Sequence, residues 1–149
     1  MAKKSIKNGQ RSFPQIKVET TDPSKIVIDA NKLESHFTDD NVSISLRYYK
    51  KSCECFSDWK KDELKKFSAT IDKLSKYSIS QLKGHKPLCD SHKGPPAEGR
   101  FSVPDKISPD QLFHEIKVDP SNKLRVHGFF SGPVFFLVWL DREHACFPE

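Results

Sequence analysis

The most apolar part of the chain lies near its C-terminal end, in residues 123–147. Within it, residues 134–140 read VFFLVWL, seven apolar residues with no polar interruption. This length is typical of a strand, and the lack of alternation predicts a central strand that is covered on both faces. The preceding Ser-Gly-Pro at 131–133 indicates a turn, so residues 124–130 are expected to form the partner strand of a hairpin. We expect the sheet to be built around this hairpin.

Two earlier stretches also have strand patterns. Residues 113–118 (FHEIKV) are a strand candidate, and a turn is predicted after them at 119–122. Residues 41–49 (NVSISLRYY) alternate between apolar and polar positions, which predicts a half-buried strand. The positions expected on its buried face are Val42, Ile44, Leu46 and Tyr48.

Residues 57–77 give the clearest helical pattern. Four apolar positions recur at spacings of three, four and three, so they form one stripe on a helix. Ser57 or Asp58 is expected to cap the first turn of this helix. The stripe consists of Leu64, Phe67, Ile71 and Leu74.

A second, shorter helix is predicted directly after the first. Ser78 and Gln81 have the spacing of a capping box, and Gly84 is suited to end the helix that the box begins. Residues 84–111 then hold five prolines and three of the six glycines of the chain. They predict a long connection, which either lies over the sheet, contacts a partner or is a tolerated insertion.

The predicted elements divide the chain into an N-terminal extension, residues 1–40, and a single domain, residues 41–149. Within the extension, residues 16–18 and 26–28 are short apolar runs, and a short helix is predicted through Leu33 and Phe37. The extension is therefore expected to be partly ordered. The domain is expected to be α+β: a mostly antiparallel sheet of about four to six strands, with one long and one short helix on one side.

Charge narrows the choice of partners. The chain of 149 residues has a net charge of +5, and residues 47–86 alone carry eleven basic and five acidic side chains. A local basic surface suits an anionic partner such as nucleic acid, but a solvated helix face has the same pattern. The candidate nucleic-acid contacts are Lys60, Lys61, Lys65, Lys66 and Arg47.

The pattern of apolar residues gives no support for a membrane protein or a secreted protein. No run of about 18 apolar residues is present, and the basic N-terminus lacks the apolar core of a secretory signal, so we expect a cytoplasmic protein without membrane contact. In that compartment the four cysteines, Cys53, Cys55, Cys89 and Cys146, are expected to be free thiols. The alternative is a zinc site formed by Cys53, Cys55, Cys89 and His92, although their spacing is not that of a standard zinc motif.

The C-terminal strands carry a resemblance to a known family. Strands 113–118, 124–128 and 134–140 are followed by Asp-Arg-Glu-His at 141–144 and by Phe147. In element order and in these short patterns, residues 42–148 resemble the RelE/ParE superfamily of bacterial toxins. The resemblance implies one of three outcomes: cleavage of mRNA, mostly on the ribosome and without a metal, action on DNA gyrase, or neither activity. For a toxin it also implies a cognate antitoxin as partner.

Metal-independent RNA cleavage needs a general base, a cation at the phosphate and a general acid. Arg125 and His127 share one strand face because they are two positions apart. The resemblance implies that Arg125 contacts phosphate and that His144 acts as acid or base. The alternatives are a solvated or ion-paired side chain for Arg125 and a hydrogen bond under a loop for His127. The full set of candidate catalytic residues is His144, Arg125, His127, Arg142 and Glu115.

The sequence therefore leads to a hypothesis and one alternative. The hypothesis is a toxin-type, metal-independent endoribonuclease that acts on RNA or the ribosome, with no metal and no other cofactor. The alternative is a non-catalytic module of the same fold that binds nucleic acid or protein. Neither is decided by the fold class, because one fold serves many functions.

Overall fold

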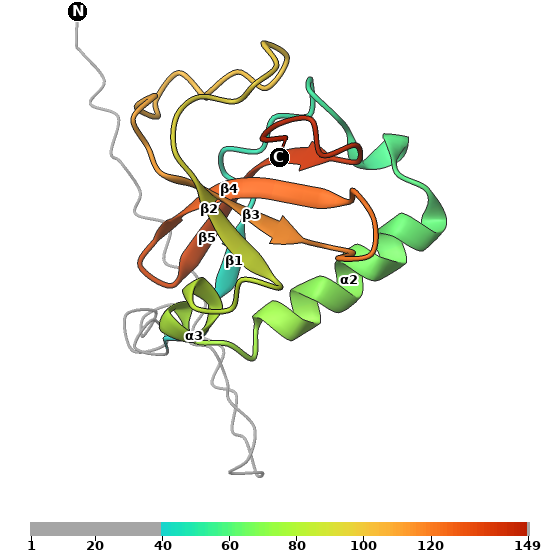
Figure 1. The fold of residues 1–149 in the computed structure, drawn as a ribbon, viewed down its shortest axis with the longest axis vertical. Coiled ribbons are helices and arrows are strands. Elements are labelled where there is room, and N and C mark those ends of the chain that lie inside the picture. Colours follow the sequence, from blue (N-terminus) through green and yellow to red (C-terminus); the bar gives the residue numbers. More distant parts are fainter. Residues whose placement is uncertain (1–39, 149) are drawn as a thin grey trace, which may run out of the picture. The chain divides into compact units, whose positions relative to one another are not determined.

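The computed structural model describes residues 40–148, and the expectations for residues 1–39 lie outside this range. The domain is α+β, as predicted (Figure 1). Its elements, in chain order, are β1 (Ser43–Ser45), the 3₁₀ turn η2 (Phe56–Asp58), α2 (Lys61–Leu74), α3 (Ile79–Lys83), β2 (Cys89–His92), β3 (Phe113–Lys117), β4 (Arg125–Ser131) and β5 (Val134–Asp141).

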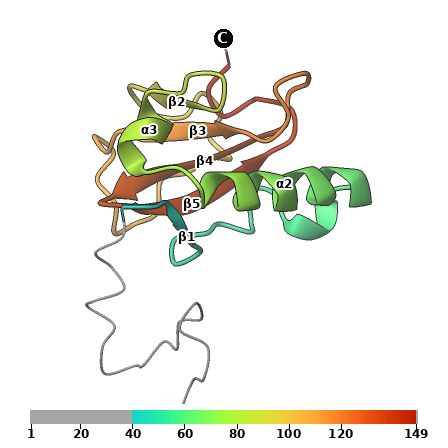
Figure 2. The ribbon, with the colours of Figure 1, turned by 90° about the horizontal axis from the view of Figure 1, so that it is seen from below.

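The five strands form one sheet in the order β1-β5-β4-β3-β2. Strand β1 runs parallel to β5, and the other three pairs are antiparallel. Strand β5 lies between β1 and β4, and its residues from Leu137 to Asp141 are all buried. The prediction of a central, doubly covered strand is confirmed. Figure 2 shows α2 and α3 together in front of the sheet.

Alternate residues of the strands belong to two separate hydrophobic cores, one on each face of the sheet, because successive side chains point to opposite faces. On the helix side, Leu74 and Leu82 pack with Ile116 of β3. On the other side, Phe113 of the same strand packs with Trp139 and with residues that lie outside the sheet. Those outer residues include Phe101, Cys146 and Phe147. The second face is therefore covered by the 84–111 connection and the C-terminal segment.

The strand predicted over residues 41–49 is wrong in extent, because only Ser43–Ser45 pairs with β5. Leu46, expected inside, is 54% exposed. The chain turns after Leu46, where the amide of Tyr49 donates to the Leu46 carbonyl at 3.1 Å. Tyr48 and Tyr49 lie in and after this turn and are not part of the strand. Tyr49 packs on Phe56, with ring centroids 5.1 Å apart. Aromatic packing thus ends a strand that alternation alone would have extended.

The long helix begins four residues later than Ser57. Asp58 caps the preceding 3₁₀ turn instead, accepting a hydrogen bond from the Cys55 amide at 2.8 Å. The Glu63 side chain caps the first turn of α2 by accepting a hydrogen bond from the Lys60 amide at 2.7 Å. The second helix agrees with its capping-box prediction, since Ser78 Oγ accepts from the Gln81 amide at 3.2 Å.

The long connection predicted over residues 84–111 contains a strand, β2, that the sequence pattern did not predict. This strand pairs antiparallel with β3, and the Lys117 amide donates to the Leu88 carbonyl at 2.8 Å. The sequence CDSH shows neither an apolar alternation nor a β-branched residue, so local pattern does not indicate a strand. Pairing with the exposed edge of β3 imposes it. Strand β2 brings His92 onto the sheet.

Gly128 of β4 lies opposite a bulge in β5, at a position where only glycine fits. The register of β4 against β5 shifts between His127 and Gly128. An added Cβ would overlap the Phe136 carbonyl oxygen and lie 2.9 Å from Phe135 Cζ. Gly128→Ala is therefore expected to lower the free energy of unfolding by about 2–3 kcal/mol through overpacking, measured by urea denaturation.

Gly99→Ala is the matched control for this prediction. A Cβ at position 99 would meet no atom within 4 Å. The stability of this variant should stay within about 0.5 kcal/mol of the wild type. Equal effects of the two substitutions would contradict the close approach at Gly128.

Candidate functional site

Glu115 of β3 is the centre of a cluster of basic side chains. It is 3% exposed, and its Oε2 lies 2.9 Å from His92 Nε2 and 3.1 Å from His144 Nε2. Its Oε1 lies 3.7 Å from Arg125 Nε and 3.9 Å from Lys117 Nζ. Burial raises the pKa of Glu115, but the hydrogen bond of His92 and the other nearby imidazoles outweigh it and lower the pKa to about 2. An ionised carboxylate only accepts hydrogen bonds, so both imidazoles present N–H groups to it.

The strand register explains how these side chains meet. Residue 92 on β2 is paired with Phe113, which makes Glu115 its diagonal neighbour on the same face. On the other side of β3, His127 of β4 is directly opposite Glu115. The sequence suggested His92 only as a member of the alternative zinc set, because nothing local indicates that residues 89–92 form a strand.

A second buried pair lies beside this cluster. His127 Nε2 is 2.8 Å from Asp141 Oδ2, and both residues are 0% exposed. Burial lowers the pKa of His127, so its imidazole is neutral near pH 7. Burial raises the pKa of Asp141, but the hydrogen bonds from His127 and from two backbone amides have the larger effect. The pKa of Asp141 is therefore lowered. His127 therefore donates from Nε2, while its buried Nδ1 has no hydrogen-bond partner.

The turn after β5 places His144 over Glu115. Asp141 Oδ1 accepts from the amide of Ala145, and Oδ2 accepts from that of Cys146, both at 2.9 Å. These bonds hold a tight turn in which His144 has a φ of 56°, a left-handed conformation that costs a non-glycine residue about 1–2 kcal/mol. Such strain is concentrated at functional sites.

Phe147 closes the cluster from the C-terminal side. Its ring stacks on that of His92 with centroids 4.6 Å apart and an interplanar angle of 1°. It also meets the His127 ring at 5.4 Å. The side chains of His92 and His144 keep 24% and 12% exposure, whereas that of His127 is closed off. Only the first two imidazoles are accessible to a substrate.

Arg125 is used mainly by the protein itself. Its Nη1 donates to three backbone carbonyls of the β3–β4 turn, at 2.8 to 3.1 Å. The residue is 7% exposed, and its Nε has no hydrogen bond although it is 3.7 Å from Glu115. Arg125 thus stabilises the turn and adds positive charge behind Glu115.

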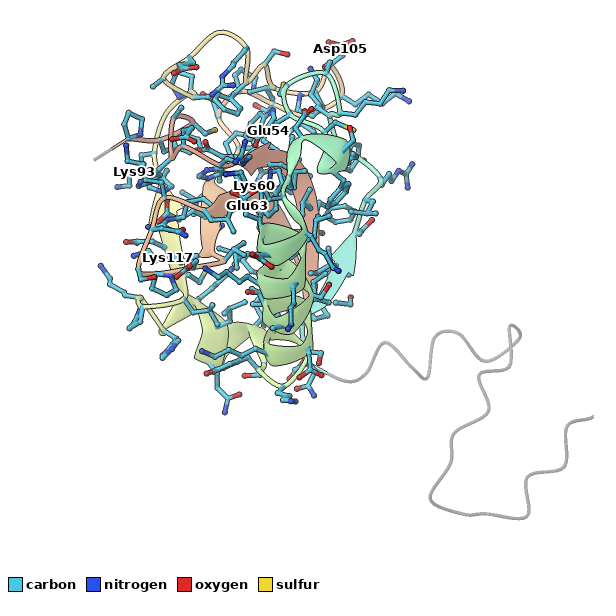
Figure 3. All side chains as sticks on the ribbon, turned by 90° about the vertical axis from the view of Figure 1, so that its right-hand side faces the viewer. Glu54, Lys60, Glu63, Lys93, Asp105 and Lys117 are labelled. Carbon is cyan, nitrogen blue, oxygen red and sulfur yellow. The ribbon has the colours of Figure 1, made fainter. Side chains whose placement is uncertain are left out.

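Arg142 points to a different partner. Its Nε lies 2.9 Å from Glu63 Oε2, and its backbone amide donates to Glu54 at 3.1 Å. Figure 3 shows Glu54, Lys60 and Glu63 close together near the start of α2. Arg142 therefore ties the end of β5 to the helix and is not among the groups that contact Glu115.

The predicted lysines are divided between open surface and a groove. Lys60, Lys61 and Lys65 are exposed on the first turns around α2, and Arg47 lies 5.7 Å from the Tyr48 ring centroid. Lys66 pairs with Asp119, which raises the pKa of the lysine. A groove of about 510 Å³ runs between α2, the 85–88 segment and the β3–β4 turn. Its charged lining residues are Lys66, Lys73, Lys117 and Asp119, and His85 also lines it.

Lys117 links this groove to the Glu115 cluster. It lines the groove and also lies 3.9 Å from Glu115. Of the lysines predicted to contact nucleic acid, Lys66 reaches the groove. Lys73 and Lys117 were missed in that role, since the groove consists of segments far apart in the sequence.

The cysteines are free thiols, as predicted. Burial raises the pKa of Cys89 to about 12 and also raises the pKa of Cys146, so neither thiol ionises near neutral pH. Within residues 40–148, the one group of metal-ligating side chains that converges contains no cysteine. The cysteine-based zinc set of the sequence analysis is thus not assembled in the described part. The converging group is His92, Glu115 and His127.

In the described part of the chain, no helix combines the length and the apolar character needed to cross a bilayer. Comparison of the chain with protein-family models, curated proteins and solved structures gave no match. The resemblance to the RelE/ParE superfamily therefore stays a prediction.

Proposed function

We propose that this protein is a toxin-type endoribonuclease whose acid and base are His92 and His144. The observation that carries the proposal is the convergence of two accessible imidazoles on one ionised carboxylate. Cleavage of RNA by attack of the 2′-hydroxyl requires a general base and a general acid, and it needs no metal. The RelE/ParE resemblance adds mRNA on the ribosome as substrate and an antitoxin as partner.

The proposed reaction uses the ring nitrogens that face away from Glu115. Both Nε2 atoms are held by the carboxylate, which leaves Nδ1 of each imidazole for the substrate. One imidazole accepts the 2′-hydroxyl proton as the 2′-oxygen bonds to phosphorus. The other donates a proton to the departing 5′-oxygen as its bond to phosphorus breaks. Glu115 stays ionised throughout and stabilises whichever ring is positively charged.

The groove next to the cluster suits the RNA backbone. Lys66, Lys73 and Lys117 line it, so successive phosphates have cations along its length. Lys117 is the lysine nearest to Glu115 and is suited to neutralise the reacting phosphate. The proposal gives this role to Lys117 because the Nη1 of Arg125 is occupied by backbone carbonyls.

The test is RNA cleavage by the full chain in the presence of a chelator. His144→Asn removes the imidazole while keeping a residue that tolerates the left-handed backbone. His92→Phe removes the other imidazole and keeps an aromatic ring against Phe147. Each variant is expected to cleave at least about a hundredfold more slowly, because general acid–base catalysis contributes that much. DNA of the same sequence, which lacks the 2′-hydroxyl, should stay intact.

His114→Phe is the matched control. His114 meets the Phe130 ring with centroids 5.0 Å apart, so this change also replaces an imidazole packed on an aromatic ring by a phenyl ring, but outside both the cluster and the groove. Its cleavage rate should equal that of the wild type. Equal rates for all three variants, or no RNA cleavage by the wild type, would contradict the proposal. Salt-dependent RNA binding without cleavage would instead support the non-catalytic module.

A further inference from the structure

Three of the clustered side chains have the chemistry and the spacing of metal ligands. One ligand atom each from His92, Glu115 and His127 lie within 4.8 Å of one another. We infer that these three residues form a binding site for one divalent metal ion of the zinc class. Two imidazole nitrogens and one carboxylate oxygen are a ligand set that such ions accept. The inference does not rest on the proposed nuclease activity.

The strongest argument comes from His127. Asp141 holds its Nε2–H at 2.8 Å, so the remaining nitrogen, Nδ1, carries a lone pair. That lone pair is buried in a residue with 0% exposure and has no hydrogen-bond partner. A carboxylate that fixes the outer nitrogen of a histidine is the usual support of a metal-ligating imidazole. A bound cation would satisfy the one polar atom of His127 that the protein leaves unpaired.

Two buried carboxylates lie at the site. Glu115 is 3% exposed and is itself an inferred ligand, and Asp141 is 0% exposed and contacts His127. Arg125 Nε and Lys117 Nζ lie 3.7 and 3.9 Å from the other oxygen of Glu115, Oε1. Its Oε2, the oxygen next to His92, is therefore the one suited to bind the ion.

The geometry needs only a small adjustment. Metal–ligand bonds of about 2.0–2.1 Å place tetrahedral ligands roughly 3.4 Å apart. His92 and Glu115 already lie 2.9 Å apart, and all three ligand atoms are within 4.8 Å. The ion would replace the proton that His92 now shares with Glu115. A water molecule would take the fourth position, as it does at zinc sites with three protein ligands.

The decisive experiment is titration of the full chain with ZnCl₂ by isothermal calorimetry, after treatment with a chelator and dialysis. We expect one ion per chain. His127→Gln keeps a donor for Asp141 but removes Nδ1, and His92→Phe removes a second ligand. Each should weaken the affinity at least tenfold. A double variant, Cys53→Ser with Cys55→Ser, controls for binding by the partly exposed thiols and should keep the wild-type affinity.

Two results would overturn the inference. One is a wild type that binds no zinc at concentrations of about 100 μM, far above typical values for such sites. The other is zinc affinity that is unchanged in both His127→Gln and His92→Phe. A folded His127→Gln, shown by an unchanged circular dichroism spectrum, keeps the comparison valid. If it fails to fold, His92→Phe on the edge strand decides alone.

The outcome is separable from that of the nuclease test. His144→Asn should lose cleavage and keep zinc binding, because the three inferred ligands remain. Zinc binding by a wild type that cleaves no RNA would remove the proposed function and leave the metal site. Where both hold, zinc should inhibit cleavage at stoichiometric concentration, since a coordinated His92 has lost its bond to Glu115 and with it the arrangement that catalysis uses.

Discussion

Asp141→Ala is expected to lower the free energy of unfolding by about 3–5 kcal/mol, because hydrogen bonds to a buried charged group contribute about 1.5–3 kcal/mol each. The carboxylate is 0% exposed and accepts hydrogen bonds from His127 and from the amides of Ala145 and Cys146. Its removal leaves these three donors, two of them buried and one part-buried, without their acceptor. Urea denaturation at pH 7 measures the change.

Asp72→Ala is the control for this substitution. Asp72 pairs with Lys76 one helical turn away at 2.7 Å, and both side chains are largely exposed. Its loss should change stability by about 0.5 kcal/mol or less. If Asp141→Ala cost no more than Asp72→Ala, the turn around residues 142–146 would have to be held by something other than this carboxylate.

Acidification is expected to destabilise the domain in two separate steps. Burial, and then the nearby Lys83, lower the pKa of His114 to about 4 from 6.5. Below pH 6.5 the unfolded chain binds a proton at His114, whereas the buried imidazole of the folded protein stays neutral. The free energy of unfolding therefore decreases by about 3 kcal/mol as the pH falls to about 4. The lowered pKa of the buried His127 acts in the same direction.

Glu115 produces the second step. Its pKa is about 2 in the folded protein against 4.5 for the free side chain. A lowered carboxyl pKa stabilises the fold above pH 4.5, and this contribution of about 3 kcal/mol is lost as the pH falls from 4.5 to about 2. The free energy of unfolding should therefore decline first between pH 6.5 and 4 and again below 4.5.

Two variants assign the steps. His114→Leu replaces a histidine whose Nδ1 has no partner, and it should flatten the decline between pH 7 and 5 by about 2 kcal/mol. Glu115→Gln should flatten the decline below pH 4.5. Urea denaturation at pH 7, 5 and 3.5 provides the comparison. A wild-type stability that is constant from pH 7 to 4 would contradict the assignment to His114.

The hairpin of β4 and β5 was predictable because its information is local. The uninterrupted apolar run and the Gly-Pro turn predict both strands of the hairpin. In the same way, Ser78 and Gln81 predict the start of α3. The edge strands were not predictable to the same degree. Strand β2 has no pattern of its own, and β1 was predicted too long, since each is defined by the strand it pairs with.

For the candidate site, the sequence supplied the residue types and part of the set. Glu115 and His144 were predicted and do meet, at 3.1 Å. His92 and Asp141 were not predicted as members, and Arg142 was predicted but pairs with Glu63. Sequence spacing shows that two residues share a face of one strand. It does not show which residue of another strand lies opposite.

The sequence by itself thus determined an α+β domain, its central strand and the C-terminal region from β3 onward in which Glu115, His127 and His144 occur. Tertiary structure alone decided that β2 joins the sheet, that His127 is closed off with Asp141 and that two imidazoles share one carboxylate. The physical reason is that strand length and capping depend on neighbouring residues, whereas register across a sheet and burial depend on chain segments far away.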